Sequence, residues 1–255
     1  MKWYFIDNGF NTGSFNMDFD INLAKNFLPD SVYFRLYRWK PYCISLGANQ
    51  SFDEIKLSKT AEDNIDVVKR PTGGRAILHS EELTYSVVMP VDFNFSPKTI
   101  YHEINKAIYK SLKIYDNRLA EIELEKTQAD FSSLYKNQTN AICFAVSAKN
   151  EINYNGQKLV GSAQRKMGNV VLQHGSILCG EYHKKIVNYL NFDETKLKVV
   201  KEKLDLNTID LESILNESID YDRLLSSLYV GFEKYFNIKM DRISQEEIFN
   251  TENII

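Results

Sequence analysis

Alternation of apolar and polar residues, short apolar runs and a turn signal predict the strands in this chain. In Val32–Trp39 the apolar residues Val32, Phe34 and Leu36 occupy every second position, so they share one face of a strand. The Asn155-Gly156 pair predicts the tight turn of a hairpin. Short apolar runs predict further strands at Ile44–Gly47, Ile65–Arg70, Ala76–Leu78, Leu83–Met89, Leu159–Gly161 and Val170–Ile177.

Helical periodicity and capping residues predict the helices. A helix is expected over Phe15–Phe27, and Ser96-Pro97 opens another, because serine caps a helix and proline suits its first turn. Two more are expected at Tyr182–Leu190 and Tyr221–Phe236. The pattern predicts an α+β fold, with a central mixed β-sheet flanked by helices and a small helical appendage near the C-terminus.

Composition and charge narrow the class of protein. The chain has 255 residues, of which 44% are hydrophobic and 25% charged, as in ordinary globular proteins. A net charge of −3 does not mark a nucleic-acid-binding protein. Neither a signal peptide nor an apolar run of membrane-spanning length is apparent, so we expect no membrane association. Three cysteines with long spacings do not form a disulfide framework, which favours a reduced, cytoplasmic protein without a structural metal.

The segment from Lys69 to His79 contains a Gly-Gly turn between two arginines. Paired glycines let a backbone approach a ligand closely, and the flanking cations could hold a carboxylate, a phosphate or a thioester carbonyl. An ordinary tight turn between strands would look the same. The candidate ligand-binding residues here are Arg70, Thr72, Gly73, Gly74, Arg75, Ala76 and His79.

A second candidate segment follows the predicted hairpin. Lys158 precedes the small residues Gly161, Ser162 and Ala163, which leave room for a substrate beside the strand. A lysine in this place can act as a cation or, if desolvated, as a neutral base, although a solvated surface lysine is the common alternative. Backbone amides near Ser162 or the Gly-Gly turn could stabilise an oxyanion. His174, like His79, is a possible hydrogen-bond donor near the same site.

Cys143 is the candidate nucleophile. It lies just upstream of the hairpin, so the sheet could bring it near Lys158, whose ammonium would lower the pKa of the thiol. A buried structural thiol is the alternative, and we assign that role to Cys43 and Cys179.

Five motifs in order resemble the biotin/lipoate protein ligase family, from about Trp3 to Leu178. They are Ser45-Leu46-Gly47 with Asn49-Gln50, Arg70-Pro71-Thr72-Gly73-Gly74-Arg75-Ala76, Leu83-Thr84-Tyr85-Ser86, Lys158-Leu159-Val160-Gly161-Ser162-Ala163-Gln164 and His174-Gly175-Ser176. The resemblance implies a sheet related to that of class II aminoacyl-tRNA synthetases. It also implies an acyl pocket beside the Gly-Gly loop, with Lys158 at the acyl carbonyl. On this basis residues 1–196 form the catalytic domain, and residues 197–255 form a small helical extension packed on it.

Within the family, the Arg-Pro-Thr-Gly-Gly-Arg-Ala form with an upstream cysteine resembles the cysteine-dependent octanoyltransferases of ligase-like sequence. Lipoate ligases commonly show Ser-Gly-Gly-Gly-Ala at this loop, and biotin ligases show a Gly-Arg-Gly-Arg loop. The resemblance implies transfer of octanoyl from octanoyl-acyl carrier protein through a Cys143 thioester. The acceptor is the lysine of a lipoyl carrier protein, such as the glycine-cleavage H protein or a dehydrogenase E2 domain, and no cofactor is needed.

Three alternatives remain open from the sequence. An ATP-dependent lipoate ligase would use Lys158 but not Cys143, whereas an amidotransferase would move octanoyl between two lipoyl carriers through Cys143. A non-catalytic subunit would only bind the acyl chain or the carrier. For any acidic carrier, we expect docking on a basic rim drawn from Arg38, Lys40, Lys149, Arg165 and Lys166.

Overall fold

The expected central mixed sheet is confirmed, and it has eight strands in the part of the chain that the structure describes. The computed structural model describes residues 1–92, 95–125 and 151–250. The strand order is β11-β1-β2-β6-β10-β9-β8-β7; β1 runs parallel to β2 and β11, and the other pairs are antiparallel. The strands are β1 (Lys2–Asn11), β2 (Ser31–Trp39), β6 (Glu82–Pro90), β7 (Glu123–Leu124), β8 (Ile152–Tyr154), β9 (Gln157–Met167), β10 (Val170–Leu178) and β11 (Met240–Arg242).

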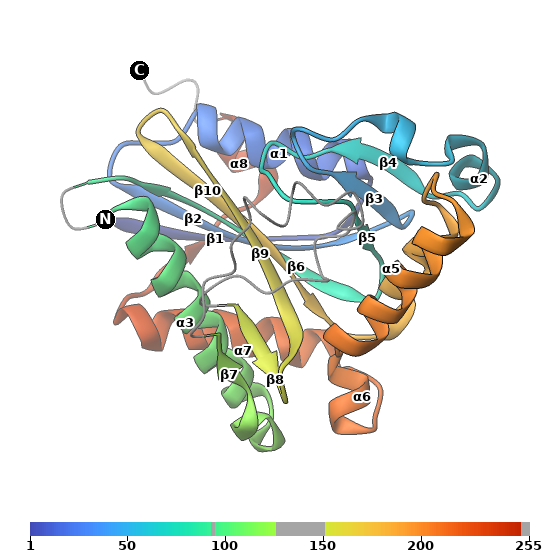
Figure 1. Ribbon diagram of the computed structural model, residues 1–255. Coiled ribbons are helices and arrows are strands. Elements are labelled where there is room, and N and C mark those ends of the chain that lie inside the picture. The colour runs from blue at the N-terminus through green and yellow to red at the C-terminus, as the bar shows by residue number, and fades with distance from the viewer. Residues whose placement is uncertain (93–94, 126–150, 251–255) are drawn as a thin grey trace.

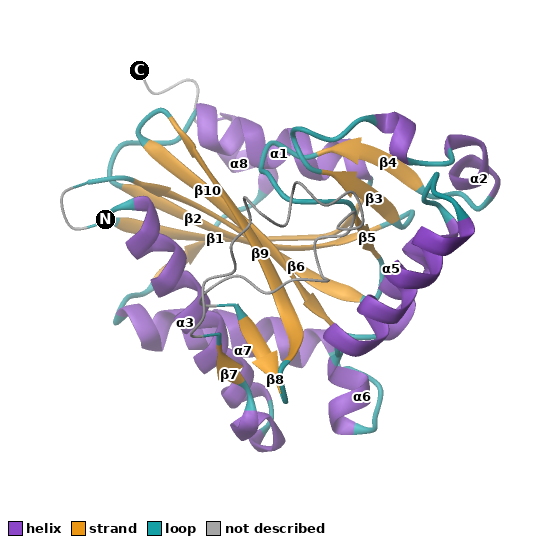
Figure 2. Ribbon diagram, in the orientation of Figure 1, coloured by secondary structure: helices purple, strands orange, loops and turns teal. Residues whose placement is uncertain are grey.

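Helices cover both faces of this sheet (Figures 1 and 2). On one face α3 (Pro97–Tyr115) and α7 (Tyr221–Phe236) pack together, and the Phe232 ring stacks on Phe34 of β2 at a centroid distance of 3.8 Å. On the other face lies α1 (Gly13–Lys25), which packs near Tyr33 and Val88. Successive residues of a strand point to opposite faces, so neighbours such as Tyr33 and Phe34 enter different cores.

A second, three-stranded sheet lies beside the face that α1 covers. Its order is β4-β3-β5, with β3 (Cys43–Leu46) parallel to β4 (Asp66–Lys69) and antiparallel to β5 (Ile77–His79). A separate apolar core supports it, to which η4 (Glu181–Asn188) and α5 (Glu194–Asn207) contribute. The other helical elements among the described residues are η1 (Phe52–Glu54), α2 (Leu57–Glu62), η2 (Asn117–Glu121), α6 (Leu211–Leu215) and α8 (Gln245–Asn250).

Several local predictions are confirmed, and a few differ in detail. Ser96 caps α3 by accepting a hydrogen bond from the Thr99 amide, and Asn155 and Gly156 form the β8–β9 turn with φ of 50° and 78°. The segment expected as a helix at Tyr182–Leu190 is the 3₁₀ helix η4. The strand expected at Leu159–Gly161 is longer, because β9 runs to Met167 as the partner of β10.

The C-terminal part of the chain packs against the main core. Leu224, Leu228 and Phe232 of α7 are buried there, and β11 extends the main sheet at its β1 edge. The division at residue 196 falls within α5, and the assignment of 1–196 and 197–255 as separate units stays a proposal.

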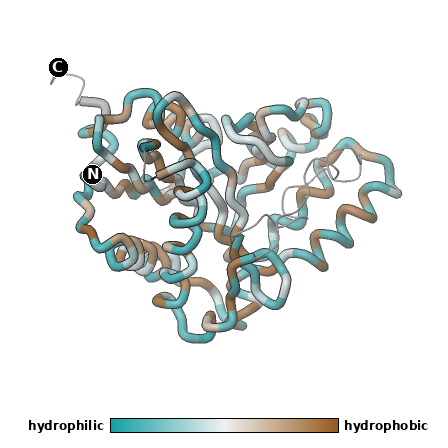
Figure 3. The backbone as a smooth tube through the Cα atoms, turned by 60° about the vertical axis from the view of Figure 1, so that its left-hand side comes forward, coloured by the Kyte–Doolittle hydropathy of each residue, from teal (hydrophilic) through white to brown (hydrophobic). Residues whose placement is uncertain are grey.

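Among the described residues, no helix is long and apolar enough to cross a bilayer. Brown and teal segments alternate along the outer helices in Figure 3, as expected for helices that bury one side.

Candidate active site

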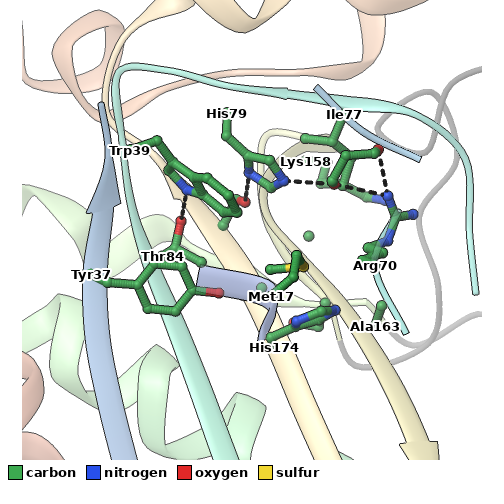
Figure 4. A pocket seen from close by; sticks show the side chains of 15 residues that line it. Met17, Tyr37, Trp39, Arg70, Ile77, His79, Thr84, Lys158, Ala163 and His174 are labelled. Atoms are coloured by element: carbon green, nitrogen blue, oxygen red, sulfur yellow. Dashed lines mark hydrogen bonds between the residues drawn. The ribbon is translucent and has the colours of Figure 1, made fainter. Parts of the chain in front are cut away.

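A narrow pocket lies between the two sheets (Figure 4), and its empty space, including the part open to solvent, is about 440 Å³. Residues of α1, of both sheets and of the loop after β4 line it: Met17, Tyr37, Trp39, Ser45, Arg70, Ile77, His79, Thr84, Lys158, Gly161, Ser162, Ala163, His174, Gly175 and Ser176.

Strand register places several polar side chains on the pocket side of the main sheet. Tyr37 of β2 pairs with Thr84 of β6, which pairs in turn with Ser176 of β10. Two residues further along β10, and hence on the same face, lies His174. These side chains are buried, and a buried polar group is costly unless it is hydrogen-bonded. Two chains of hydrogen bonds and ionic contacts satisfy them.

The first chain runs from Glu82 through His79 to Ser45. His79 Nδ1 lies 2.8 Å from Glu82 Oε1, and His79 Nε2 lies 2.7 Å from Ser45 Oγ. Burial alone would raise the pKa of Glu82, but the His79 charge and hydrogen bonds, including those from Thr84 and Ser176, lower it below its ordinary value. Glu82 is therefore ionised, and His79 Nδ1 donates a hydrogen bond to this carboxylate.

The second chain runs from Asp20 through His174 to Thr72. Thr72 Oγ1 lies 2.6 Å from His174 Nε2, and His174 Nδ1 lies 3.6 Å from Asp20 Oδ2. Burial would raise the pKa of Asp20, but the Arg35 guanidinium, 2.8 Å away, and further hydrogen bonds lower it. Burial lowers the pKa of His174, and the attraction of Asp20 offsets this only in part. A neutral His174 thus accepts a hydrogen bond from the Thr72 hydroxyl at Nε2.

These pairings determine how the pocket wall behaves toward a ligand. Trp39 donates from its indole nitrogen to Thr84 Oγ1 at 2.7 Å, and its ring stacks on His79 at a centroid distance of 4.1 Å. Because the polar atoms bond one another, carbon surfaces such as those of Met17, Trp39 and Ile77 are left to meet a ligand. Such a wall suits an apolar chain.

Arg70 holds the Gly-Gly loop in place. Its guanidinium donates to the carbonyls of Ser45, Gly73 and Arg75 at 2.8, 3.0 and 2.7 Å, so its donors are directed at the protein backbone. Gly74 has a φ of 95°, which glycine adopts readily. Gly47 lies so close to this loop that a side chain there would overlap the Gly74 carbonyl oxygen.

Lys158 is buried in the pocket wall and paired with an acid. Its Nζ lies 2.8 Å from Glu151 Oε2, and the two side chains are 2% and 3% exposed. The other carboxylate oxygen of Glu151 accepts a hydrogen bond from the Ser162 amide at 3.2 Å. This amide, expected as an oxyanion donor, therefore already has a partner. The structure shows Lys158 as a fixed, desolvated group and not as a solvated surface lysine.

The structure brings most of the predicted site residues together. Arg70, His79, Lys158, Gly161, Ser162, Ala163 and His174 line the pocket. The other loop residues support its wall: Thr72 bonds His174, the carbonyls of Gly73 and Arg75 accept from Arg70, and Ala76 is fully buried. Cys143 lies outside the described residues, and its assignment as the nucleophile stays a prediction.

Sequence reasoning missed the carboxylates and the aromatic wall. Asp20, Glu82 and Glu151 each bond an imidazole or ammonium group of the site, and Tyr37 and Trp39 line the pocket. One signal was present: polar residues such as Arg35, Glu82 and Ser86 interrupt strands that are otherwise apolar. In the part of the chain that the structure describes, no group of three or more acidic, histidine or cysteine side chains is arranged to hold a metal ion.

Comparison with known families identifies the scaffold. Residues 12–233 match the model of the lipoyl protein ligase A/B catalytic domain. The chain belongs to this family. Curated relatives named octanoyltransferase LipM include those of Clostridioides difficile and Bacillus subtilis. The first is 32% identical, covering 93% of this chain and 88% of the relative; the second is 30% identical, covering 96% and 91%.

Solved structures of the ligase family share the fold. The structure of lipoate-protein ligase A bound with ATP superposes with a TM-score of 0.75 at 18% identity. The match covers 98% of this chain and 92% of the ligase chain. The structure of a bipartite lipoate protein ligase from Thermoplasma acidophilum superposes with a TM-score of 0.76 at 18% identity, and the match covers 98% of this chain and 90% of that chain. The expected ligase-like fold is thereby confirmed.

Proposed function

We propose that this protein is an octanoyltransferase of lipoate biosynthesis. It takes octanoyl from acyl carrier protein, holds it as a thioester on Cys143, and delivers it to the lysine of a lipoyl carrier protein. The observation that carries this proposal is the buried Lys158 ammonium in the wall of an apolar pocket, in a chain whose near-full-length relatives are named octanoyltransferases.

In the first half-reaction the Cys143 thiolate attacks the carbonyl carbon of the octanoyl thioester. A carbon–sulfur bond to Cys143 forms as the bond to the donor breaks, and the donor leaves as a thiolate that takes up a proton. One thioester replaces another, so the free energy changes little. Lys158 favours the thiolate form of Cys143 and orients the carbonyl, because its ammonium is fixed by Glu151 and poorly solvated.

In the second half-reaction the neutral amine of the acceptor lysine attacks the acyl-enzyme. The nitrogen forms an amide bond to the octanoyl carbon, the Cys143 thiolate leaves, and the amine loses a proton. Amide formation from a thioester is downhill, so the reaction needs neither ATP nor a cofactor. Burial of the octanoyl tail contributes roughly 5 kcal/mol, at about 0.8 kcal/mol per CH₂.

The proposed partners follow from the two half-reactions. The donor is octanoyl-acyl carrier protein, and the acceptor is a lipoyl carrier such as the glycine-cleavage H protein or a dehydrogenase E2 domain. Since the chemistry needs a free thiol, we place the reaction in the cytoplasm, where thiols stay reduced.

Intact mass spectrometry tests the proposal directly. The protein is mixed with octanoyl-acyl carrier protein in the absence of ATP, and it should gain the mass of one octanoyl group. Cys143→Ala should gain none and should lose transfer. Cys43→Ala and Cys179→Ala are matched controls, because both thiols are fully buried and burial raises the pKa of each. Full transfer by Cys143→Ala would refute the acyl-enzyme mechanism.

The same assay separates the alternatives. Acylation that requires free lipoate and ATP would identify a ligase. An adduct formed from an octanoylated lipoyl carrier, but not from acyl carrier protein, would identify an amidotransferase. An octanoyl group that binds without covalent adduct or turnover would identify a binding subunit.

A further inference from the structure

A second, open groove lies beside the Gly-Gly loop. It has a volume of about 1,560 Å³, including space open to solvent. The C-terminal end of α1, the loop after β4 and the tip of the β9–β10 hairpin form its walls. Arg70 lines both this groove and the narrow pocket, so the two spaces adjoin at this residue.

The groove is lined by cations and by no acid. Lys25, Lys69, Arg70, Arg165 and Lys166 line it, and none of the other lining residues is Asp or Glu. Arg70 is directed at the loop carbonyls, whereas the other four are exposed. Among the described residues, none of these four has a carboxylate within 4.0 Å, unlike Lys2 and Lys59, which pair with Asp241 and Asp63.

Such a concentration of positive charge attracts a negatively charged partner. Arg165 also connects the groove to the loop, because its Nη1 donates to the Pro71 carbonyl at 2.7 Å. Because Arg70 belongs to both linings, the groove lies next to the narrow pocket at the Gly-Gly loop.

We propose that this groove receives the octanoyl donor: the phosphate-bearing arm of the acyl carrier and the acidic protein surface around its attachment point. This inference rests on the proposed function. A carrier presents its thioester at the end of a flexible arm that joins the protein through a phosphodiester. With the octanoyl chain in the narrow pocket, that phosphate meets the cations of the groove. The acceptor lysine carries no phosphate, so it lacks the anion that this groove selects.

Not all of the basic residues expected at a docking rim belong to this groove. Strand register aligns Arg165 with Tyr33 across the sheet. Arg38 lies five residues further along β2, roughly 17 Å away in the strand direction at about 3.4 Å per residue. It stacks on Tyr221 at 3.5 Å, and neither it nor Lys40 lines the groove. Lys149 lies outside the described residues.

Charge reversal with three donors tests the inference. The variant Lys25→Glu/Lys166→Glu leaves Arg70 and Arg165 in place. Its control is Lys110→Glu/Lys234→Glu, which makes the same change in net charge at exposed positions of α3 and α7, on the opposite face. The donors are octanoyl-acyl carrier protein, octanoyl-phosphopantetheine and octanoyl-pantetheine, which lacks the phosphate. Transfer rates at low donor concentration are measured at several salt concentrations, and thermal melting checks the fold of each variant.

For the groove variant we expect a loss of about tenfold or more with the carrier protein, together with a weaker salt dependence. The loss should be smaller with octanoyl-phosphopantetheine and absent with octanoyl-pantetheine, and the control should match the parent protein. An equal loss with all three donors, or no loss with the carrier, would overturn the proposal. Failure of the proposed function would look different, because the parent protein would then form no octanoyl adduct from any donor.

Discussion

Lys158 Nζ and Glu151 Oε2 lie 2.8 Å apart, and both side chains are almost completely buried. An ion pair in this setting adds little net stability, because each charge loses its hydration. Removing one partner is different, since it leaves an uncompensated charge and costs about 3–5 kcal/mol. Glu151 therefore holds the Lys158 cation at the pocket wall. The effects of this ion pair on folding and on activity can be separated.

Lys158→Ala should lose most transfer activity and also lower the free energy of unfolding, because Glu151 keeps a buried charge. Lys158→Arg should not restore activity, since the planar guanidinium differs in shape from the ammonium that contacts Glu151. The double variant Lys158→Met/Glu151→Leu removes both charges and should recover much of the stability but none of the activity. Urea unfolding and octanoyl-transfer rates measure the two effects. Near-parental rates in Lys158→Arg would show that a positive charge alone suffices.

The packing of the Gly-Gly loop on β3 predicts a second outcome. Gly47→Ala forces the Gly74 carbonyl and its loop to move, because the added methyl group overlaps backbone and not a flexible side chain. Overpacking of this kind costs about 1–3 kcal/mol, so the melting temperature should fall by several degrees. Gly73→Ala is the matched control for stability, since a methyl group there meets nothing within 4 Å. Equal melting temperatures for the two variants would contradict the tight packing at Gly47.

Burial of His174 predicts how stability depends on pH. Its pKa in the folded protein is lowered from the ordinary 6.5 that we take for the unfolded chain. At a pH between the folded pKa and the unfolded pKa, the unfolded chain therefore binds a proton that the folded chain does not. The free energy of unfolding should therefore rise with pH through this window and level off above about pH 7. Asp20 and Glu82 act at lower pH. Their pKa values are lowered from 3.8 and 4.5, so their contribution is lost only as the pH falls below those values.

Urea unfolding at about pH 5.5, 6.5 and 7.5 measures this slope. His174→Gln should flatten it in part and not completely, because burial also lowers the pKa of His183. His183→Gln should flatten it independently, and the two effects should add. A parental slope in His174→Gln would mean that the buried imidazole is not the source of the dependence.

Local sequence patterns predicted the elements that depend on local chemistry. The Asn155-Gly156 turn and the Ser96 cap need only a few neighbouring residues, and both are present as expected. Strand β1 was missed because Phe5 and Ile6, adjacent in the chain, are buried on opposite faces of the sheet, which removes the alternation. A strand covered on both faces carries little period-two signal.

The pocket was predictable only in outline. Glycine and lysine motifs indicated where the chain would meet a ligand, and these residues do gather at one pocket. These chains of polar contacts were not predictable, because Asp20 and His174 lie far apart in the sequence and meet only through the packing of α1 on β10. Likewise, nothing local distinguishes Glu151 from a surface acid, and its role appears once β8 and β9 pair.

Met17 provides the last prediction, which concerns acyl chain length. Its side chain projects from α1 into the pocket and is 4% exposed. Met17→Ala makes room for further methylene groups, each worth about 0.8 kcal/mol when buried, so preference should shift from octanoyl toward decanoyl by roughly tenfold in kcat/KM. Met89→Ala is the matched control: it loses the same side chain from the core that α3 and α7 cover, away from the pocket, at a similar cost in stability of about 2–5 kcal/mol. Competition between octanoyl and decanoyl donors, followed by mass spectrometry, measures the ratio. Met89→Ala loosens the fold without enlarging the pocket, so it should keep the preference for octanoyl. The same shift toward decanoyl in both variants would mean that Met17 does not limit the length of the acyl chain.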